Sequence, residues 1–288
     1  MPRHPLMIVR LKRRRLNSFF NSLTTLPLSI RPSSIKDLLI IPLLIIRPII
    51  LSSILWDYAR WTLWFWILSR KRYLMFKIRD FIVMSPSEPE IFAIIEDVFC
   101  KEVYGRVVSK DLKIVDIGSH IGLYTIKSSA EMGKSGLIIS VEPHPVNFTL
   151  LRINLDLNNL RNVLTVNLIA SDKNGREKLY LSESSALCST LFKEGGYIEV
   201  NARRLDSILQ KLGITEVDIV KIDVEGSELN VLRGMGDYLK RVKAIVVAAY
   251  HYEGEEQEIS RFLLKMGFKI LVADGYVYAS RKNSISYD

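Results

Sequence analysis

The stretch that decides the fold is KIVDIGSHIG, residues 113–122, in which a short apolar strand runs directly into a loop with two glycines. Lys113–Ile117 is typical of a buried strand, and Gly118 and Gly122 follow it at once. Glycine lets the backbone approach a ligand closely, and α/β sheets bind their ligands at the carboxyl ends of strands. The sequence therefore predicts a ligand-binding loop at this point.

The spacing of this loop is D-x-G-x-x-x-G, because Asp116 stands where a dinucleotide-binding G-x-G-x-x-G loop has its first glycine. A carboxylate at this place would repel the pyrophosphate of a dinucleotide. S-adenosylmethionine has no phosphate and carries an ammonium and a sulfonium, so an acid favours it. The alternative is an ordinary strand-to-helix turn with Asp116 as a cap.

A second acid follows at the end of the next predicted strand. Glu142, in Ser140-Val-Glu-Pro143, comes 20 residues after Gly122. Acids with this spacing accept hydrogen bonds from both ribose hydroxyls in Rossmann folds. Pro143 is expected to pack against the adenine. A surface glutamate before a loop is the alternative.

The third motif is KIDVEGSE, residues 221–228, which follows the predicted strand residues Asp218–Val220. Asp223 and Glu225 alternate out of a strand end toward the same edge of the sheet. Carboxylates beside an apolar strand need a partner, such as a cation, a metal or a substrate hydroxyl. A solvated strand end followed by a helix remains the alternative.

Strands and helices alternate along the rest of this part of the chain, which predicts a parallel sheet covered by helices on both faces. The last two strands, around Asp274-Gly275, are expected to close the sheet as a pair. Strands are expected at 113–117, 137–141, 163–170, 177–181, 218–222, 244–249, 268–271 and 276–279, and helices at 91–104, 124–131, 145–158, 205–212, 227–234 and 257–266.

Together, the motifs at 116–122, 142–143 and 221–228, with Val231-Leu-Arg-Gly234, resemble the FkbM family of S-adenosylmethionine-dependent methyltransferases. The resemblance covers about 110–280. It implies a Rossmann-like α/β fold, a mostly parallel sheet with an antiparallel C-terminal strand, and methyl transfer to a hydroxyl of a sugar, glycan, lipid or other small molecule.

The resemblance also implies roles for particular residues. The cofactor is expected to contact the loop after the first strand, the acid Glu142, the segment 167–171 near the adenine, and Asp223. Asp223 and Glu225 would also face the methyl-transfer cleft. The expected cofactor-binding residues are Asp116, Gly118, His120, Gly122, Glu142, Pro143, Ala170, Ser171 and Asp223.

A hydroxyl acceptor loses a proton during methylation, so a general base is expected. His251, after the strand at 244–249, is one candidate, and Asp223 and Glu225 are others; His120 is a rival within the cofactor loop. The sequence departs from the expected family pattern here, because Tyr250 rather than an acid precedes His251. No metal site is expected.

The positive charge of the chain is concentrated in its first part. Residues 1–80 contain 15 Lys and Arg and 3 Asp and Glu, whereas residues 81–288 have a net charge of −3. We therefore expect a basic, apolar, helical extension over 1–80 and a methyltransferase domain over 81–288, without nucleic acid as a partner.

The segment 37–80 contains all four tryptophans, and its apolar runs are too short to span a bilayer. It is expected either to pack as a helical cap or to contact a membrane surface. Two cysteines without motif spacing favour a cytoplasmic protein.

Two other functions stay open. One is an NAD-dependent oxidoreductase, which the absence of G-x-G-x-x-G disfavours, and the other is a non-catalytic scaffold at a membrane.

Overall fold

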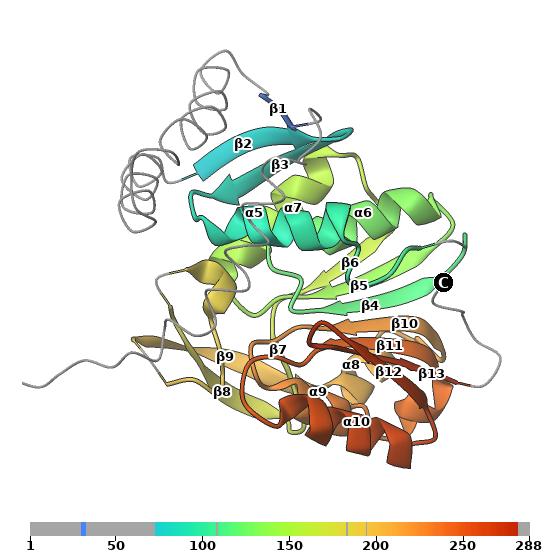
Figure 1. Ribbon diagram of the computed structural model, residues 1–288. Helices are drawn as coiled ribbons and strands as arrows, with labels where there is room; N and C mark the ends of the chain where they lie inside the picture. The colour runs from blue at the N-terminus through green and yellow to red at the C-terminus, as the bar shows by residue number, and fades with distance from the viewer. Residues whose placement is uncertain (1–29, 33–72, 108, 183, 194, 282–288) are drawn as a thin grey trace, which may run out of the picture.

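The computed structural model describes residues 30–32, 73–107, 109–182, 184–193 and 195–281. Its centre is a seven-stranded sheet with the order β12-β13-β11-β10-β4-β5-β6 (Figure 1). Every pairing in this sheet is parallel except the two that β13 makes. The expected α/β class with an antiparallel C-terminal strand is thus confirmed. The strands are β4 (Lys113–Ile117), β5 (Leu137–Val141), β6 (Val163–Val166), β10 (Val217–Ile222), β11 (Val242–Ala248), β12 (Lys269–Ala273) and β13 (Tyr276–Ser280).

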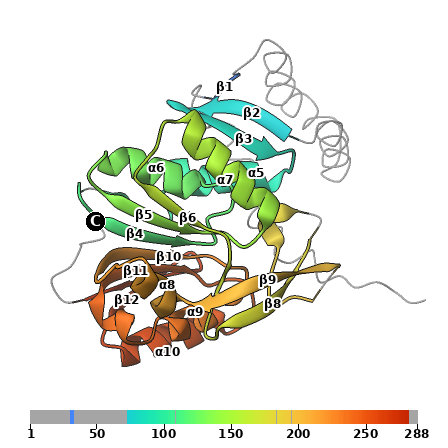
Figure 2. The same cartoon turned by 180° about the vertical axis from the view of Figure 1, so that it is seen from behind.

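Helices cover both faces of the sheet, as Figures 1 and 2 show from opposite sides. Alternate side chains of each strand supply two cores: Ile114 and Ile138 pack under one layer of helices, and Val115 and Ile139 under the other. The first layer holds α5 (Glu90–Ile95), its continuation η1 (Glu96–Cys100), α6 (Leu123–Met132) and α7 (Pro145–Leu157), and the second holds α8 (Leu205–Lys211), α9 (Glu228–Gly234), η3 (Gly236–Arg241) and α10 (Glu255–Lys265).

A hairpin that was not expected from the sequence lies outside α7. β2 (Tyr73–Ile78) pairs with β3 (Phe81–Pro86) across a two-residue turn, and β1 (Ile30–Pro32) pairs with β2. Asn154 of α7 and Asn158, the residue that follows α7, bind the free edge of β3 through their side-chain amides. Asn154 accepts from the Met84 N–H at 2.7 Å and donates to the Met84 carbonyl at 2.9 Å. Asn158 makes the same two contacts with Ile82, at 2.9 and 2.7 Å.

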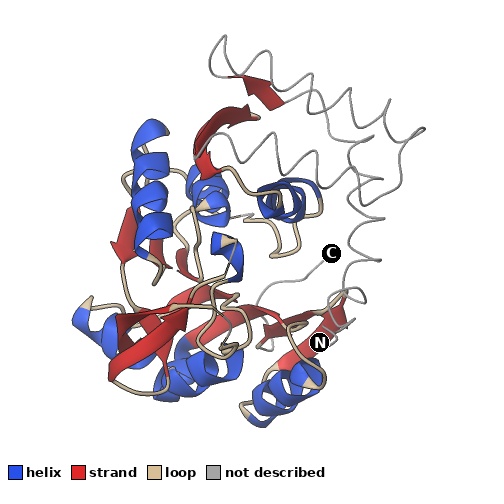
Figure 3. Cartoon of the chain, turned by 90° about the vertical axis from the view of Figure 1, so that its left-hand side faces the viewer, coloured by secondary structure: helices blue, strands red, loops and turns tan. Residues whose placement is uncertain are grey.

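A second, smaller sheet follows β6 and lies at the lower left of Figure 1, the side that faces the viewer in Figure 3. It contains β7 (Ile169–Ser171), β9 (Tyr197–Arg204) and β8 (Gly175–Tyr180), and the turn η2 (Ser185–Leu187) lies between β8 and β9. The single strand expected over 163–170 is therefore wrong. The chain leaves the main sheet at Asn167, whose amide donates to the carbonyls of Glu142 and Pro143 at 2.8 and 3.1 Å.

Most of the expected helical extension over 1–80, including 37–70 with its tryptophans, lies outside the described residues. Where this region is described, Ile30–Pro32 and Tyr73–Ile78 are strands rather than helix. The expected boundary at 80/81 falls in the turn of the β2–β3 hairpin, and it stays a prediction. Among the described helices, none combines the length and apolarity that crossing a bilayer requires.

Candidate functional site

A cavity of about 150 Å³ opens at the carboxyl ends of β4, β5 and β10. The strand order reverses between β4 and β10, and open α/β sheets bind ligands at such a switch point. The structure brings most of the expected site residues to this one cavity. Those that line it are Gly118, His120, Glu142, Pro143, Ala170, Asp223 and Glu225. Asp116, Gly122, Ser171 and His251 are outside the lining.

The loop after β4 has room for nothing larger than glycine at position 118. Gly118 has φ +73, and a Cβ there would lie 1.7 Å from the carbonyl oxygen of Asp223. The Asp223 N–H in turn donates to the Ile117 carbonyl at 3.0 Å. The ends of β4 and β10 are thus held in direct contact. Gly122, with φ +88, begins α6 rather than lining the cavity, and it packs against Leu151.

Asp116 contacts neighbouring side chains beneath the loop and does not line the cavity, and its expected contact with the cofactor stays a prediction. Its side chain is fully buried and lies 3.2 Å from the Lys221 Nζ on the neighbouring strand β10. Thr125 Oγ1 donates to its other oxygen at 2.6 Å. Lys221 also donates to the Gly118 carbonyl at 2.7 Å. The pair therefore supports the loop from beneath.

Glu142 is at the end of β5, as expected, and its carboxylate faces the cavity. One oxygen accepts the backbone N–H of His120 at 2.8 Å and the other that of His144 at 2.9 Å. Each carboxylate oxygen has a second lone pair that these bonds leave available. Burial raises the pKa of Glu142 to about 7, against the lowering effect of the two backbone N–H groups.

His120 and Asn147 both line the cavity, and each has one buried side-chain atom without a hydrogen-bond partner among the described residues. These atoms are His120 Nδ1 and Asn147 Oδ1. The remaining polar atoms of both side chains contact Ser185: His120 Nε2 lies 3.2 Å from its hydroxyl, and the Asn147 amide donates to its carbonyl at 3.0 Å. Burial, with Lys221 nearby, lowers the pKa of His120 to about 3, so the ring is neutral.

The segment expected beside the adenine is only partly at the cavity. Pro143, Leu168 and Ala170 line it. Ser171 points away, because its hydroxyl donates to the Glu177 carboxylate on β8. The insert between β8 and β9 closes this side, and Leu187 and neighbouring residues of η2 reach the cavity wall.

Asp223 and Glu225 form the opposite wall. Asp223 Oδ2 accepts the hydroxyl of Tyr104 at 2.6 Å, which fixes its orientation. Burial alone would raise the pKa of Asp223, but His251, Lys221 and the Tyr104 hydroxyl together hold it well below its usual value. Glu225 has a backbone φ of +56 and lies beside Asp223 at the cavity.

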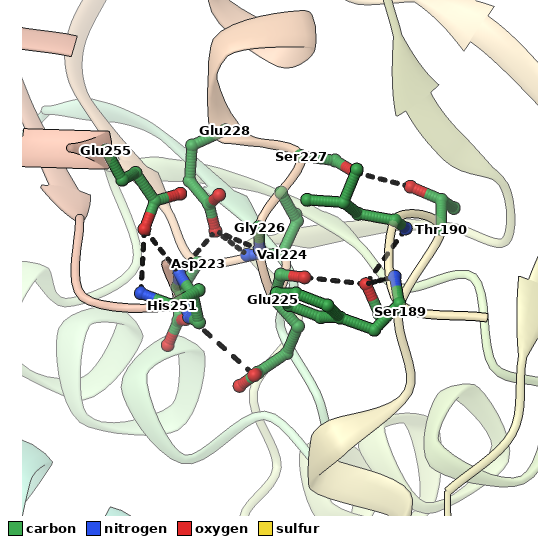
Figure 4. A network of polar contacts seen from close by, with 12 residues as sticks. Ser189, Thr190, Asp223, Val224, Glu225, Gly226, Ser227, Glu228, His251 and Glu255 are labelled. Carbon is green, nitrogen blue, oxygen red and sulfur yellow. Dashed lines mark hydrogen bonds and ion pairs between the residues drawn. The ribbon is translucent and has the colours of Figure 1, made fainter. Parts of the chain in front are cut away.

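His251 lies behind these acids, enclosed by four carboxylates (Figure 4). Burial alone would lower the pKa of His251, but the carboxylates raise it to about 11. The ring in this state already carries both protons. This state disfavours His251 as the general base, because a protonated imidazole cannot accept a proton, and the assignment of the base stays a prediction.

The acid that the family pattern places before His251 has a substitute in the structure. Glu255, four residues later at the start of α10, accepts the His251 backbone N–H at 2.8 Å and lies 3.1 Å from its Nδ1. Two further residues of the site, Tyr104 and Lys221, were not predicted from the sequence. Lys221 belongs to the motif at 221–228, whereas nothing in the sequence marks Tyr104, which is 119 residues from its partner Asp223.

Comparison with known proteins identifies relatives of this chain. Residues 116–270, more than half of the chain, match the model of the methyltransferase FkbM domain. Methyltransferase 1 of Beauveria bassiana is 27% identical over 187 residues, which cover 56% of this chain and 74% of that protein. The 31-O-demethyl-FK506 methyltransferase FkbM of Streptomyces tacrolimicus is 23% identical over 199 residues, covering 58% and 76%.

Among solved structures, the methyltransferase FkbM of Methylobacillus flagellatus is similar, with a TM-score of 0.48 and 20% identity. The match covers 67% of this chain and half of that one.

Proposed function

Because the chain belongs to the family of methyltransferases with an FkbM domain, we propose that it transfers a methyl group from S-adenosylmethionine to a hydroxyl of a small molecule, such as a sugar, glycan or lipid. The observation that carries the proposal is the division of one cavity between two walls. Glu142 and the Gly118 loop form one wall, and Asp223 with Glu225 forms the other. The first suits a nucleoside and the second suits an acceptor.

The residues at the first wall fit the proposed cofactor. Glu142 has lone pairs for two ribose hydroxyls, and His120 Nδ1 and Asn147 Oδ1 are buried polar atoms that need a partner. A dinucleotide fits less well, because its pyrophosphate would face the carboxylates of Glu142, Asp223 and Glu225. The NAD-dependent alternative is therefore disfavoured by charge as well as by the loop spacing.

S-adenosylmethionine supplies a methyl group that its sulfonium already activates, so the protein is left with two tasks. The first is to hold the acceptor in line, and the second is to take up the proton that the hydroxyl loses. We assign both tasks to Asp223 and Glu225, which line the cavity. Tyr104 positions Asp223 by its hydroxyl, and His251 holds the two acids by charge at 3.7 Å from each.

Two measurements test the proposal in sequence. Calorimetric titration with S-adenosylhomocysteine and with NAD should show binding of the former alone. Labelled S-adenosylmethionine, incubated with the protein and a cellular extract of small molecules and lipids, should then label a low-molecular-weight product. Binding of NAD without binding of S-adenosylhomocysteine would replace the proposal by the oxidoreductase, and binding of neither would favour the scaffold.

We also propose a cytoplasmic setting and no nucleic-acid partner. Cys100 and Cys188 are both free, as a reducing compartment permits. The net charge of −3 over residues 81–288 gives no basic track for phosphates. Membrane contact by 37–80 stays a prediction from the sequence, because that segment lies almost wholly outside the described residues.

A further inference from the structure

The cluster around His251 has two sides with different chemistry (Figure 4). On one side, the Nδ1 atom lies 3.1 Å from Glu255 Oε2 and 3.4 Å from Glu228 Oε1. On the other side, the Nε2 atom lies 3.7 Å from both Asp223 Oδ1 and Glu225 Oε2. The second pair of acids lines the cavity, whereas the first pair is buried behind it.

On the Nδ1 side, the ring nitrogen has a hydrogen-bond partner, Glu255. Glu255 binds both the ring and the backbone N–H of His251, and Glu228 accepts the backbone N–H groups of Val224 and Gly226 at 2.9 and 3.2 Å. These contacts fix the direction of the ring and place the Nδ1 proton toward Glu255. A carboxylate that holds a histidine from behind is the usual support of a histidine that binds a metal through its other nitrogen.

The Nε2 side has the opposite character. The His251 side chain is only 3% exposed, yet its Nε2 has no hydrogen-bond partner among the described residues, and the same is true of Asp223 Oδ1. A separation of 3.7 Å is too long for a hydrogen bond. The donor atoms of His251, Asp223 and Glu225 nevertheless lie within 4.8 Å of one another.

We propose that Asp223, Glu225 and His251 Nε2 bind one divalent cation of the Mn²⁺ type at the wall of the cavity. Metal–ligand bonds of about 2.1 Å allow two donors on one ion to be up to about 4.2 Å apart, so the observed 3.7 Å suits a shared ion. Two carboxylates with one imidazole suit Mn²⁺, which accepts hard oxygen ligands and tolerates nitrogen. The ion takes the place of the Nε2 proton.

The role of this ion rests on the proposed function, whereas its binding does not. Three protein ligands leave coordination positions for oxygens of an acceptor in the cavity. An ion at that place would position the acceptor and lower the pKa of a bound hydroxyl, so that its proton can leave to water. Asp223 and Glu225 would then act on the acceptor through the ion. Ligand spacing in the sequence does not reveal this site, because the donors come from two separate segments.

Titration of the full chain with Mn²⁺, followed by the paramagnetic resonance signal of the free ion and without cofactor or acceptor, tests the site. We expect about one tightly bound Mn²⁺ per chain. Glu225→Gln should weaken its binding at least roughly tenfold, the usual effect of losing part of a metal site. Glu253→Gln, an exposed acid two residues after His251, should leave it unchanged and serves as the control.

Circular dichroism shows whether each variant is folded, and Asp223→Asn replaces Glu225→Gln if the latter is not. The proposed site would be overturned if the Glu225→Gln and Glu253→Gln variants bound Mn²⁺ equally, or if no saturable binding were seen. His251 Nε2 would then carry a proton and no metal ion. Calorimetry with S-adenosylhomocysteine on the same sample separates the two proposals: if it binds and Mn²⁺ does not, only the cation site fails.

Discussion

Glu142 is a buried carboxylate whose ionisation decides how well it accepts hydrogen bonds from a ligand. With its pKa at about 7, it is mostly neutral at pH 6 and mostly charged at pH 8. Ribose hydroxyls are donors, so they bind the charged form and lower its pKa in the complex. We therefore predict that the affinity for S-adenosylhomocysteine rises roughly tenfold from pH 6 to pH 8, as calorimetry at a series of pH values would show.

The neutral variant Glu142→Gln is the control, and its profile should be flat after correction for titration of the ligand itself. His120 titrates far below this range, since its pKa is about 3. Glu142→Ala should weaken binding by roughly 1.5–3 kcal/mol, the size of a lost charge-assisted hydrogen bond. A wild-type profile that matches that of Glu142→Gln would remove Glu142 from the cofactor site.

Gly118 allows a prediction about close packing at the site. Gly118→Ala places a methyl group against the Asp223 carbonyl, whereas Gly213→Ala, at a similar φ of +69, meets nothing within 4 Å. The second variant should lose only the strain of the left-handed backbone, about 1–2 kcal/mol. The first should lose clearly more stability and also cofactor affinity. Equal free energies of unfolding in urea would show that the two strand ends can separate easily.

For single residues, the sequence predicts a role that depends on the local backbone. It does not predict a role that depends on a partner far away in the chain. Gly118 and Glu142 lie at the cavity because a strand end and the following loop place them there. Asp116 lies just before the same loop, in β4, but its carboxylate pairs with Lys221, more than 100 residues later, and does not line the cavity. The protonation of His251 likewise depends on acids from separate segments that only folding brings together.

Among the elements, α7 has an unusual task, because its side chains replace a missing strand. Four residues of helix rise by about 6 Å, and two residues of strand by about 6.7 Å. Asn154 and Asn158 therefore match the spacing of Met84 and Ile82 on β3. The two asparagine side chains thereby attach the hairpin to the main domain through hydrogen bonds to the backbone of β3.

Asn154→Ala should therefore destabilise the protein by about 3 kcal/mol, since it leaves buried backbone groups without partners. Asn154 is fully buried and also donates to the Ile121 carbonyl at 2.9 Å. Asn158→Ala, at a half-buried position, should cost less, and Asn201→Ala on the surface of β9 should change the free energy of unfolding by under about 0.5 kcal/mol. If all three cost the same in urea unfolding, the amide contacts contribute little.

Buried apolar strands were predictable, whereas the β2–β3 hairpin and the polar strand β9 were not. Strands β4 and β5 have the predicted bounds, because apolar runs between glycines or polar loops define them. The β2–β3 hairpin escaped because its turn, Arg79-Asp80, has neither glycine nor asparagine, although Arg79 adopts φ +51. The polar surface strand β9 lacked an apolar face to reveal it; its side chains are mostly exposed or half-buried.

For the whole molecule, the hairpin determines where a stable chain can begin. Phe76 and Ile78 of β2 are buried in the same core as α5 and α6. A chain over 81–288 loses both side chains, worth about 1.5–3 kcal/mol each, whereas a chain over 73–288 keeps them. We predict that the longer chain is more stable by several kcal/mol in urea and binds S-adenosylhomocysteine. Equal stability would support the boundary at 80/81.

The amide contacts of α7 also bear on how the protein behaves at high concentration. A strand at the border of a sheet offers unpaired N–H and C=O groups, onto which a strand from another molecule can add. On β3 these groups are already bound at Ile82 and Met84. The two asparagines thus keep a strand of another molecule from adding to β3, and so oppose the fibrous aggregates that such addition produces. A comparison of stability alone would overlook this effect.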